Sequence, residues 1–347
     1  MNIKMTLQQT DPDIGKTVIK DISDIVFNIS YENQIVGQPG KLTFDCVDDQ
    51  TTYFNEGAII QLVVDDVGVF YGYVFASTVN ETEVIGVTAY DQMRYLQNGD
   101  IYVISGMTAS QVFEMICLDF NIKKYNVVSP SSLIIPARVH DGKSLFDIID
   151  FGIGHELRFN QKWYMMRDNF GVLEFIDVAT LKTDYILNSN ENIFKYTFES
   201  TIDEDTYNQV KIYQENRVNK KGKAVKNGGT VVSRDYGFDR DPNTIATWGT
   251  LQYCDKSDKG MNQAQLDMYA HSLLSQKDRP TQKFTLSAEG NLDINAGNQI
   301  VIYIGKVQQK INDRVYFLVT ACTHSFSNNQ HTMDLTLMLP QYGLALR

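Results

Sequence analysis

One alternating stretch occurs twice in this 347-residue chain, over residues 57–95 and again over residues 297–339. Both copies begin with glycine and then place aliphatic residues at every second position, with Ile60, Leu62 and Val64 matched by Ile300, Ile302 and Ile304. Side chains of a β-strand point alternately to the two faces of its sheet, so this pattern buries one face. The repeat predicts that one three-strand unit is built twice within the chain.

Aromatic residues follow in each copy, on the strand after the first turn. Residues 71–76 read YGYVFA, and residues 316–321 read YFLVTA. Because these residues stand in alternating strands, we expect the core to contain Tyr71, Tyr73, Phe75 and Tyr316. This pattern weighs against an exposed aromatic platform of the kind that a carbohydrate-binding or receptor-binding module would present.

The order of strand and helix patterns divides the chain into three parts. Residues 1–103 are strand-rich and predict a first β-barrel domain, and residues 104–190 predict an inserted α+β module. Residues 191–347 return to strands and predict a second β-barrel domain, with an irregular and helical excursion at about 215–280. The expected fold class is mainly β with an α+β insertion, that is, two similar β-barrel domains and a small α+β module.

Local signals place single elements within these parts. Thr108 and Gln111 form a capping box before one helix, and Ser144 is placed to cap another. A third helix is predicted over residues 262–276 from its apolar spacing. Short strands are predicted in the α+β module at residues 157–159, 162–167 and 171–177.

Composition limits the classes of function. The formal net charge of -11 and the pI near 4.9 argue against a nucleic-acid-binding surface, which needs a basic stripe. No run is apolar and long enough for a signal peptide or a membrane span, so we expect a chain that stays in the cytoplasm until assembly or lysis. The four cysteines lack the paired spacing of zinc sites or disulfide frameworks. Cys117 on an apolar helix face and Cys322 in a strand are expected to be buried thiols.

The sequence patterns that could indicate a catalytic or metal-binding site are weak. Gly142-Lys-Ser144 lacks the earlier glycine of a phosphate-binding loop. His324 and His331 flank a probable hairpin turn and are expected to lie close together, but no third metal ligand accompanies them. Carboxylate pairs fall in predicted turns, where solvated residues are common. We therefore expect no enzyme activity, no cofactor and no catalytic or metal-binding residue.

One basic cluster stands out in an otherwise acidic chain. Its members are Arg217, Lys220, Lys221, Lys223 and Lys226. The cluster is either a solvated hairpin or a surface that docks an acidic partner by electrostatic attraction.

Several stretches, taken in order, carry a family resemblance. They are residues 72–75, 87–96, 108–111, 142–149, 171–175, 297–301, 323–326 and 331–337. Their succession resembles the central hub protein of contractile phage tails and phage-tail-like particles, a family related to the hub half of type VI secretion spikes. The resemblance covers most of the chain but leaves out residues 215–257.

This resemblance implies a purpose for the repeat. In such hubs two similar barrels lie side by side in each subunit, and three subunits form a ring with six nearly equivalent surfaces. The ring would join a hexameric tail tube to a three-fold spike. The implied partners are two further copies of the chain, the tail tube protein, the spike protein and other baseplate proteins. The implied location is a virion or phage-tail-like particle, assembled in the host cytoplasm.

Two alternatives come from other classes of protein. One is a cell-wall glycan hydrolase associated with a tail tip, which would need two facing carboxylates in a sugar cleft. The other is a β-rich receptor-binding or carbohydrate-binding module. We expect neither, because no carboxylate pair is placed for glycan chemistry and the aromatic residues stand within strands.

Overall fold

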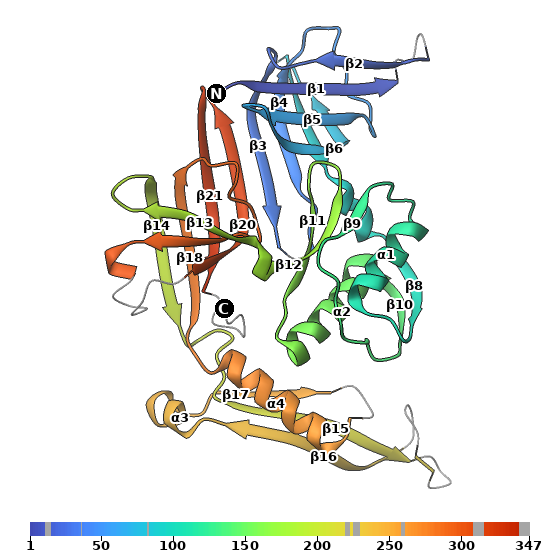
Figure 1. Cartoon of the computed structure of the whole chain (residues 1–347), viewed down its shortest axis with the longest axis vertical. Coiled ribbons are helices and arrows are strands. Elements are labelled where there is room, and N and C mark those ends of the chain that lie inside the picture. Colours follow the sequence, from blue (N-terminus) through green and yellow to red (C-terminus); the bar gives the residue numbers. More distant parts are fainter. Residues whose placement is uncertain are drawn as a thin grey trace. The chain divides into compact units, whose positions relative to one another are not determined.

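The computed structural model describes residues 1–10, 15–35, 37–81, 83–218, 223–224, 230–257, 261–307 and 316–339. The chain separates into two compact units (Figure 1). The first unit comprises Met1–Phe198 together with Phe284–Pro340, and the second comprises Glu199–Lys283. The predicted fold class is confirmed, because strands dominate and helices are few.

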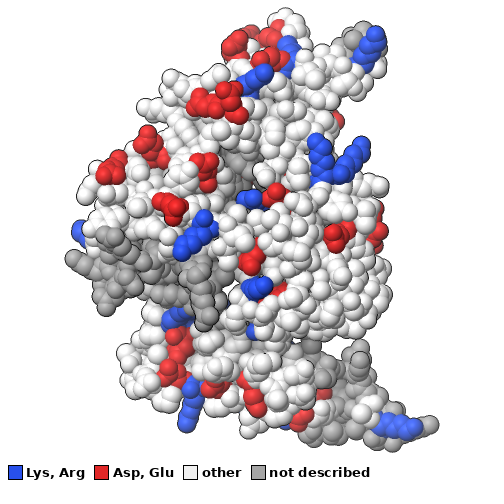
Figure 2. Space-filling model, viewed as in Figure 1, with Lys and Arg blue, Asp and Glu red and all other residues white. Residues whose placement is uncertain are grey.

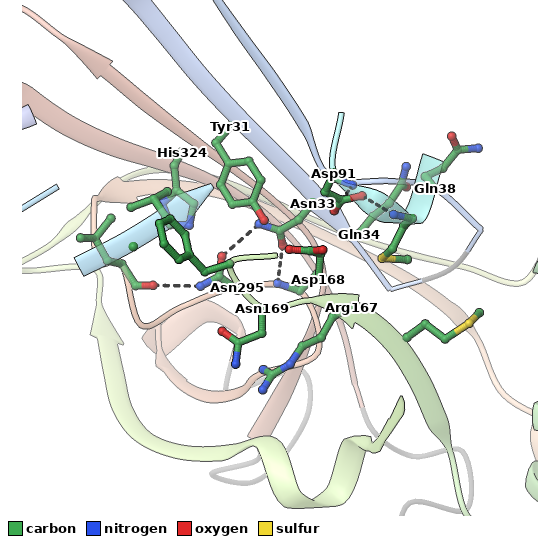
Figure 3. A pocket seen from close by; sticks show the side chains of 18 of the residues that line it. Tyr31, Asn33, Gln34, Gln38, Asp91, Arg167, Asp168, Asn169, Asn295 and His324 are labelled. Carbon is green, nitrogen blue, oxygen red and sulfur yellow. Dashed lines mark hydrogen bonds between the residues drawn. The ribbon is translucent and has the colours of Figure 1, made fainter. Parts of the chain in front are cut away.

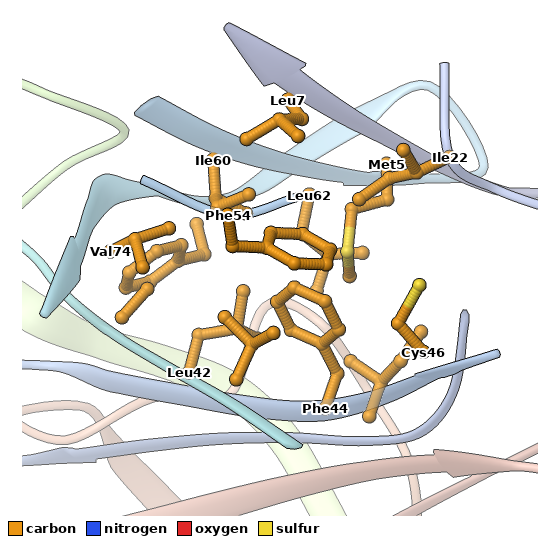
Figure 4. Packing of buried hydrophobic residues seen from close by; sticks show 14 of the residues in the cluster. Met5, Leu7, Ile22, Leu42, Phe44, Cys46, Phe54, Ile60, Leu62 and Val74 are labelled. Atoms are coloured by element: carbon orange, nitrogen blue, oxygen red, sulfur yellow. The ribbon is translucent and has the colours of Figure 1, made fainter. Parts of the chain in front are cut away.

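Seven strands form the first β domain. They are β1 (Ile3–Thr10), β2 (Thr17–Asp21), β3 (Val26–Gln34), β4 (Lys41–Val47), β5 (Ile59–Val64), β6 (Val67–Val79) and β7 (Val84–Tyr90). They pair in the order β3-β4-β7-β6-β5-β1-β2. The sheet folds over one core, in which Ile60 and Leu62 face Leu42 and Phe44 (Figure 4). The buried alternation predicted for the first repeat is confirmed.

Four aromatic residues of the repeats that were predicted to belong to the core are half-buried, so the prediction is wrong for Tyr71, Tyr73, Phe75 and Tyr316. On β6 the buried positions are instead Phe70, Gly72 and Val74. The inward position 72 is a glycine because a Cβ there would lie 2.3 Å from the carbonyl oxygen of Tyr90. Since side chains of a strand alternate between faces, Tyr71 and Tyr73 point to the outer face.

The α+β module follows the first β domain. Its elements are η1 (Gln92–Gln97), β8 (Gly99–Ile104), α1 (Ala109–Asp119), β9 (Tyr125–Val127), β10 (Arg138–Ser144), α2 (Leu145–Asn160), β11 (Tyr164–Asp168), β12 (Leu173–Asp177) and η2 (Val178–Leu181). The predicted capping box of Thr108 and Gln111 is present, and Ser144 accepts a hydrogen bond from the backbone N–H of Asp147. Both helix starts are therefore confirmed.

Residues 157–159 belong to helix α2, so the short strand predicted there is wrong. The helix continues because Glu156, 1% exposed, lies on its buried face and accepts hydrogen bonds from the N–H groups of Ser132 and Leu133 at 2.6 and 2.7 Å. These bonds tie the last turns of α2 to the preceding loop. The helix ends at Gln161, which adopts a left-handed conformation.

Six strands form the second β domain. They are β13 (Lys182–Asn188), β14 (Ile193–Thr201), β18 (Thr281–Glu289), β19 (Gln299–Tyr303), β20 (Tyr316–Ser327) and β21 (Gln330–Met338). They pair in the order β14-β18-β21-β20-β19-β13, which has the same sequence of neighbours as β3-β4-β7-β6-β5-β1. The similarity thus reaches six strands, although β13 runs parallel to β19 while β1 runs antiparallel to β5.

One strand pair joins the two β domains. Strand β20 pairs with β3 antiparallel, from Ala321 opposite Gln34 to Phe326 opposite Ile29. A single hydrogen-bonded path therefore runs from β14 through β20 and β3 to β2.

The second unit is a small sheet covered by a helix. Its elements are β15 (Gln209–Val218), β16 (Thr230–Arg240), α3 (Pro242–Trp248), β17 (Gln252–Lys256) and α4 (Gln263–Lys277). The strands pair in the order β16-β15-β17, and Val210 and Ile212 pack against Leu266 and Ala270 of α4. The predicted third helix is confirmed, with Asn262 as its N-cap.

Surface charge and buried thiols agree with the composition. On the face that Figure 2 shows, the blue atoms of described residues occur singly or in small groups. Cys117 and Cys322 are buried free thiols as predicted, Cys46 is also a buried free thiol, and Cys254 is exposed on β17. Within the described part of the chain, no helix combines the length and apolar character that a membrane span requires.

Candidate functional site

A small cavity lies where the three parts of the first unit meet. Its volume is about 110 Å³, and its lining includes Tyr31 of β3, Asp91 before η1, Asp168 of β11, Asn295 before β19 and His324 of β20 (Figure 3). These residues are far apart in the sequence. The sequence offered no local signal for the cavity, because its lining comes from six separate segments.

Two carboxylates of this cavity are held by directed hydrogen bonds. Asp91 accepts from the N–H groups of Gly40 and Met93 at 2.8 and 2.9 Å. Asp168 accepts from the N–H of Gly171 at 2.6 Å and from the side-chain amide of Gln92 at 3.1 Å. Burial, together with the negative charge of Asp168, raises the pKa of Asp91 well above its ordinary value. Burial is also the main cause that raises the pKa of Asp168.

Amide side chains link the same segments. Asn33 of β3 donates to Asn295 at 3.0 Å and accepts from the N–H of Ala296 at 2.7 Å. Gln92 donates to the carbonyl oxygen of Gly171 at 2.7 Å in the β11–β12 hairpin. The cavity is therefore bordered by bonds that connect the first β domain to both the α+β module and the second β domain.

The size of this cavity bears on the hydrolase alternative. Small-molecule sites usually occupy about 300–1,000 Å³, and a glycosidase needs its two carboxylates to flank a sugar. At about 110 Å³ the cavity around Asp91 and Asp168 has room for a few water molecules but not for a sugar ring. The cavity around this carboxylate pair is therefore smaller than the space that a glycosidase site needs.

His324 and His331 are close together, as the sequence predicted. His324 Nδ1 lies 3.0 Å from His331 Nε2, and His324 Nε2 lies 3.2 Å from the Cys322 sulfur. Burial and the neighbouring His331 lower the pKa of His324 to about 4, so its imidazole is neutral at pH 7. In the described part of the chain, no three His, Cys, Asp or Glu residues are grouped so that they could hold a metal ion.

The main path of the sheet ends in two edge strands, and its branch ends in a third, β13, which pairs only with β19. Among the described residues, β2 pairs only with β1, and β14 pairs only with β18. The residues of both strands are mostly exposed, including Ile19 and Phe194. An open edge carries unpaired N–H and C=O groups and is a ready surface for a strand of another chain.

A broad groove lies beside one of these edges. It has a volume of about 1240 Å³ and is lined by Met1 and Val67 of the first β domain and by Tyr185, Ile186 and Phe194 of the second. Its charged lining side chains are all acidic, namely Asp65, Glu289 and Asp293. The groove exposes clustered apolar residues, which is typical of a protein-binding surface.

The predicted basic cluster lies mostly beyond what the structure describes. Arg217 is placed by its backbone on β15, opposite Val231, and Lys223 is exposed. Lys220, Lys221 and Lys226 lie outside the described residues. The role of the cluster in docking an acidic partner stays a prediction.

Comparison with known proteins gives one family and several phage-related relatives. The YQBQ-like family model matches residues 29–338 of this chain. The uncharacterised protein YqbQ of Bacillus subtilis (strain 168) is 25% identical over 320 residues, covering 90% of this chain and 91% of YqbQ. The phage-like element PBSX protein XkdQ of the same organism is 26% identical over 293 residues, covering 84% of each chain.

Solved structures share the fold. The 43 kDa tail protein of prophage MuSo2 from Shewanella oneidensis matches with a TM-score of 0.70 at 12% identity, over 98% of this chain and 99% of that one. The Escherichia coli c3393 protein is a type VI secretion component similar to the T4 tail proteins gp27 and gp5. It matches with a TM-score of 0.55 at 12% identity, over 92% of this chain and 75% of that one. The resemblance to tail hub proteins is confirmed, and the chain belongs to the YQBQ-like family.

Proposed function

We propose that this protein is a non-enzymatic structural hub of a tail baseplate, in which three copies form a ring between a six-fold tube and a three-fold spike. The observation that carries the proposal is the shared pairing order of its two β domains. Two similar sheets in each chain give six in a trimer. A ring of this kind can meet six-fold symmetry on one face and three-fold symmetry on the other.

The open sheet edges support assembly into a ring. Strands β2 and β14 end the hydrogen-bonded path, and each has one unpaired side. Exposed edges of this kind promote uncontrolled pairing unless another chain or element covers them. In a closed ring every copy offers the same two edges to its neighbours, so none is left at an end.

The similar proteins support a location in a phage tail. XkdQ takes its name from a phage-like element, and the solved protein of prophage MuSo2 is a tail protein. We therefore infer a place in the tail of a virion or phage-tail-like particle, assembled in the host cytoplasm. The tube protein, the spike protein and other baseplate proteins would be its neighbours.

The proposal also assigns a role to each domain of the chain. Residues 1–103 and residues 191–347, the latter together with strand β13, would supply the two ring-forming domains, and the rest of residues 104–190 would supply a module outside the ring. Separate hydrophobic clusters in these parts support that division. The basic cluster at Arg217, Lys220, Lys221, Lys223 and Lys226 would dock an acidic partner.

Mass photometry and electron microscopy of the purified 39.5 kDa chain test the proposal. The expected result is a particle of three chains that averages to a three-fold ring with six lobes. A stable monomer, both alone and with its spike partner, would contradict it. A peptidoglycan zymogram tests the hydrolase alternative, and the hub proposal expects no clearing.

A further inference from the structure

Main-chain hydrogen bonds equate the two repeats residue by residue. The N–H of Gly57 donates to the carbonyl oxygen of Val74 at 2.8 Å, and the N–H of Gly297 donates to that of Val319 at the same distance. Directly after these valines, β6 and β20 each contain a bulge. Val74 of β6 therefore corresponds to Val319 of β20, and the residues that follow correspond in order.

The strands that begin the two pairing orders also correspond. These strands are β3 in the first β domain and β14 in the second. Once the pairing equates them, their residues match as well, since residues 26–32 read VFNISYE and residues 193–199 read IFKYTFE. Tyr31 then corresponds to Phe198, whose ring lies 5.6 Å from that of Phe284 on β18. The match fixes which residue of β14 corresponds to which residue of β3.

Within one chain, β3 has a partner in the other β domain. It pairs with β20, with Glu32 opposite Thr323 and Tyr31 opposite His324 (Figure 1). This contact uses the part of β20 that lies past its pairing with β19. The pairing of β6 with β5 likewise ends at Tyr73. Among the described residues, the rest of β6 pairs with no strand except β7, so its other edge is open.

The loop before each repeat lies against its strand in the same way. The hydroxyl of Ser77 donates to the carbonyl oxygen of Phe54 at 3.5 Å, and the thiol of its counterpart Cys322 donates to that of Ile294 at 3.4 Å. The two residues after Ile294 hold the side chain of Asn33 on β3. The two residues after Phe54 are exposed. The first β domain therefore repeats the surface that receives β3, but the described part of the chain places no strand on it.

Apolar side chains show the same difference between the two places. His324 is fully buried, and its partner Tyr31 is 8% exposed. Their counterparts are Val79, which is 67% exposed, and Phe198, which is half-buried. Removing apolar surface from water is favourable. A strand that covers β6 as β3 covers β20 would therefore bury the exposed side chain of Val79.

We propose that β14 of one copy pairs with the end of β6 of the next copy, in the register of the β3–β20 ladder. Thr78 then lies opposite Glu199 of the neighbouring copy, just as Thr323 lies opposite Glu32 within the chain. The inference rests on the proposed ring and names the strands that close it. Three chains would form six similar junctions, three within chains and three between them. Because the two edges differ, the contact repeats from copy to copy until the ring closes.

An engineered disulfide tests the register of this pairing. Directly opposed residues of antiparallel strands have Cα atoms about 4.5–5.5 Å apart, a distance that a disulfide can span. The test variant is T78C/E199C and the matched control is E32C/T323C, both with C254S because Cys254 is an exposed native thiol. After mild oxidation, non-reducing electrophoresis should show covalent trimers for the test variant. The control should form its disulfide within one chain and run as a monomer.

A charged substitution tests the same contact independently. V79D places a carboxylate where the proposed pairing buries Val79 against Phe198 of the neighbouring copy. The control is V103D, because Val103 is 73% exposed on β8, outside the proposed contact. Both valines are exposed in the single chain, so the far-ultraviolet circular dichroism of both variants should match that of the wild type. An Asp forced into an apolar contact weakens self-association by roughly 100-fold or more.

Mass photometry is therefore expected to show trimers for the wild type and V103D, and monomers for V79D. V79D trimers as stable as those of V103D would overturn the pairing while leaving the trimer intact. The same conclusion would follow if the control disulfide formed but T78C/E199C gave no covalent trimer. If neither disulfide formed, the comparison of V79D with V103D would decide. A wild type that never forms trimers would overturn the proposed function as well.

Discussion

His324 of the second β domain stacks on Tyr31 of the first, with ring centroids 6.2 Å apart and planes inclined by 10°. The two residues are direct partners in the β20–β3 ladder. His324 is fully buried, and Tyr31 is 8% exposed. The two β domains are therefore joined by backbone hydrogen bonds and by a buried aromatic contact, which makes this junction sensitive to any charge placed on the imidazole.

Acid should weaken the junction through His324. The pKa of this residue is lowered to about 4 in the folded state, against 6.5 for an exposed histidine. The unfolded chain therefore binds more protons, and the stability that neutral His324 provides is lost as the pH falls from about 6.5 toward 4. The expected slope from this residue approaches about 1.4 kcal/mol per pH unit. Urea unfolding of the wild type and H324Q between pH 7 and 4.5 measures the difference.

The control for His324 is N126Q, because Asn126 is exposed on β9 and its side chain does not titrate. We expect H324Q to be less stable than the wild type at pH 7 but to lose less of its stability on acidification. N126Q should keep the wild-type dependence. If H324Q and the wild type lost stability in parallel, the buried neutral imidazole would not be the cause.

The contribution of Asp91 to stability should change with pH in the direction opposite to that of His324. Its pKa is raised in the folded state, so the folded chain binds more protons than the unfolded chain above pH 3.8. Its contribution to stability therefore falls as the pH rises from about 4 through the raised pKa. D91N removes this charge, and we expect the stability of the variant to decline less than that of the wild type between pH 5 and 8.

The measurement for Asp91 is again urea unfolding as a function of pH. D66N serves as a control, since Asp66 lies in an exposed turn between β5 and β6. D91N also loses part of the acceptor pair that Asp91 offers to Gly40 and Met93, so its absolute stability at pH 5 should be lower. The pH dependence is the deciding quantity, and equal slopes in D91N and the wild type would refute the assignment.

The sequence predicts the repeat but not its full extent. Alternation reveals β5 and β19 because every second residue is aliphatic, as at Ile60 and Ile300. The equivalence of β3 with β14 has no such signal, because an entire unit of the chain separates β14 from its partner β18. Pairing between distant strands depends on tertiary packing, which local periodicity does not contain.

The small cavity between the parts of the first unit could not be predicted from the sequence either. Tyr31, Asp168 and Asn295 are ordinary residues in their local context, and only the fold brings them together. The prediction of a strand at residues 157–159, which belong to α2, was wrong for a related reason that involves Glu156. A glutamate on a buried helix face interrupts the apolar pattern, and its compensating partners lie in another segment. The two histidines were predictable because a hairpin turn places residues on either side of it face to face.

Loss of the Asn33 side chain should loosen the link between the β domains. Asn33 donates to Asn295 and accepts from the N–H of Ala296, so N33A leaves two partly buried polar groups without these bonds. We expect a loss of about 1–3 kcal/mol in the free energy of unfolding. Chemical denaturation measures this loss, and N126A at an exposed position of β9 should change stability by less than about 0.5 kcal/mol. Equal stability of N33A and N126A would show that the link contributes little.

Gly237 should tolerate no side chain, because strand β16 passes directly beneath helix α4. A Cβ at this position would lie 2.1 Å from the carbonyl oxygen of Leu266, so G237A forces the helix away from the sheet. We expect a loss of about 1–3 kcal/mol, confined to the second unit. Hydrogen exchange should show faster exchange in β15, β16 and α4 and unchanged protection in β20. G86A is the control, since the nearest atom to a Cβ there is 3.8 Å away, and equal exchange in the two variants would contradict the close approach.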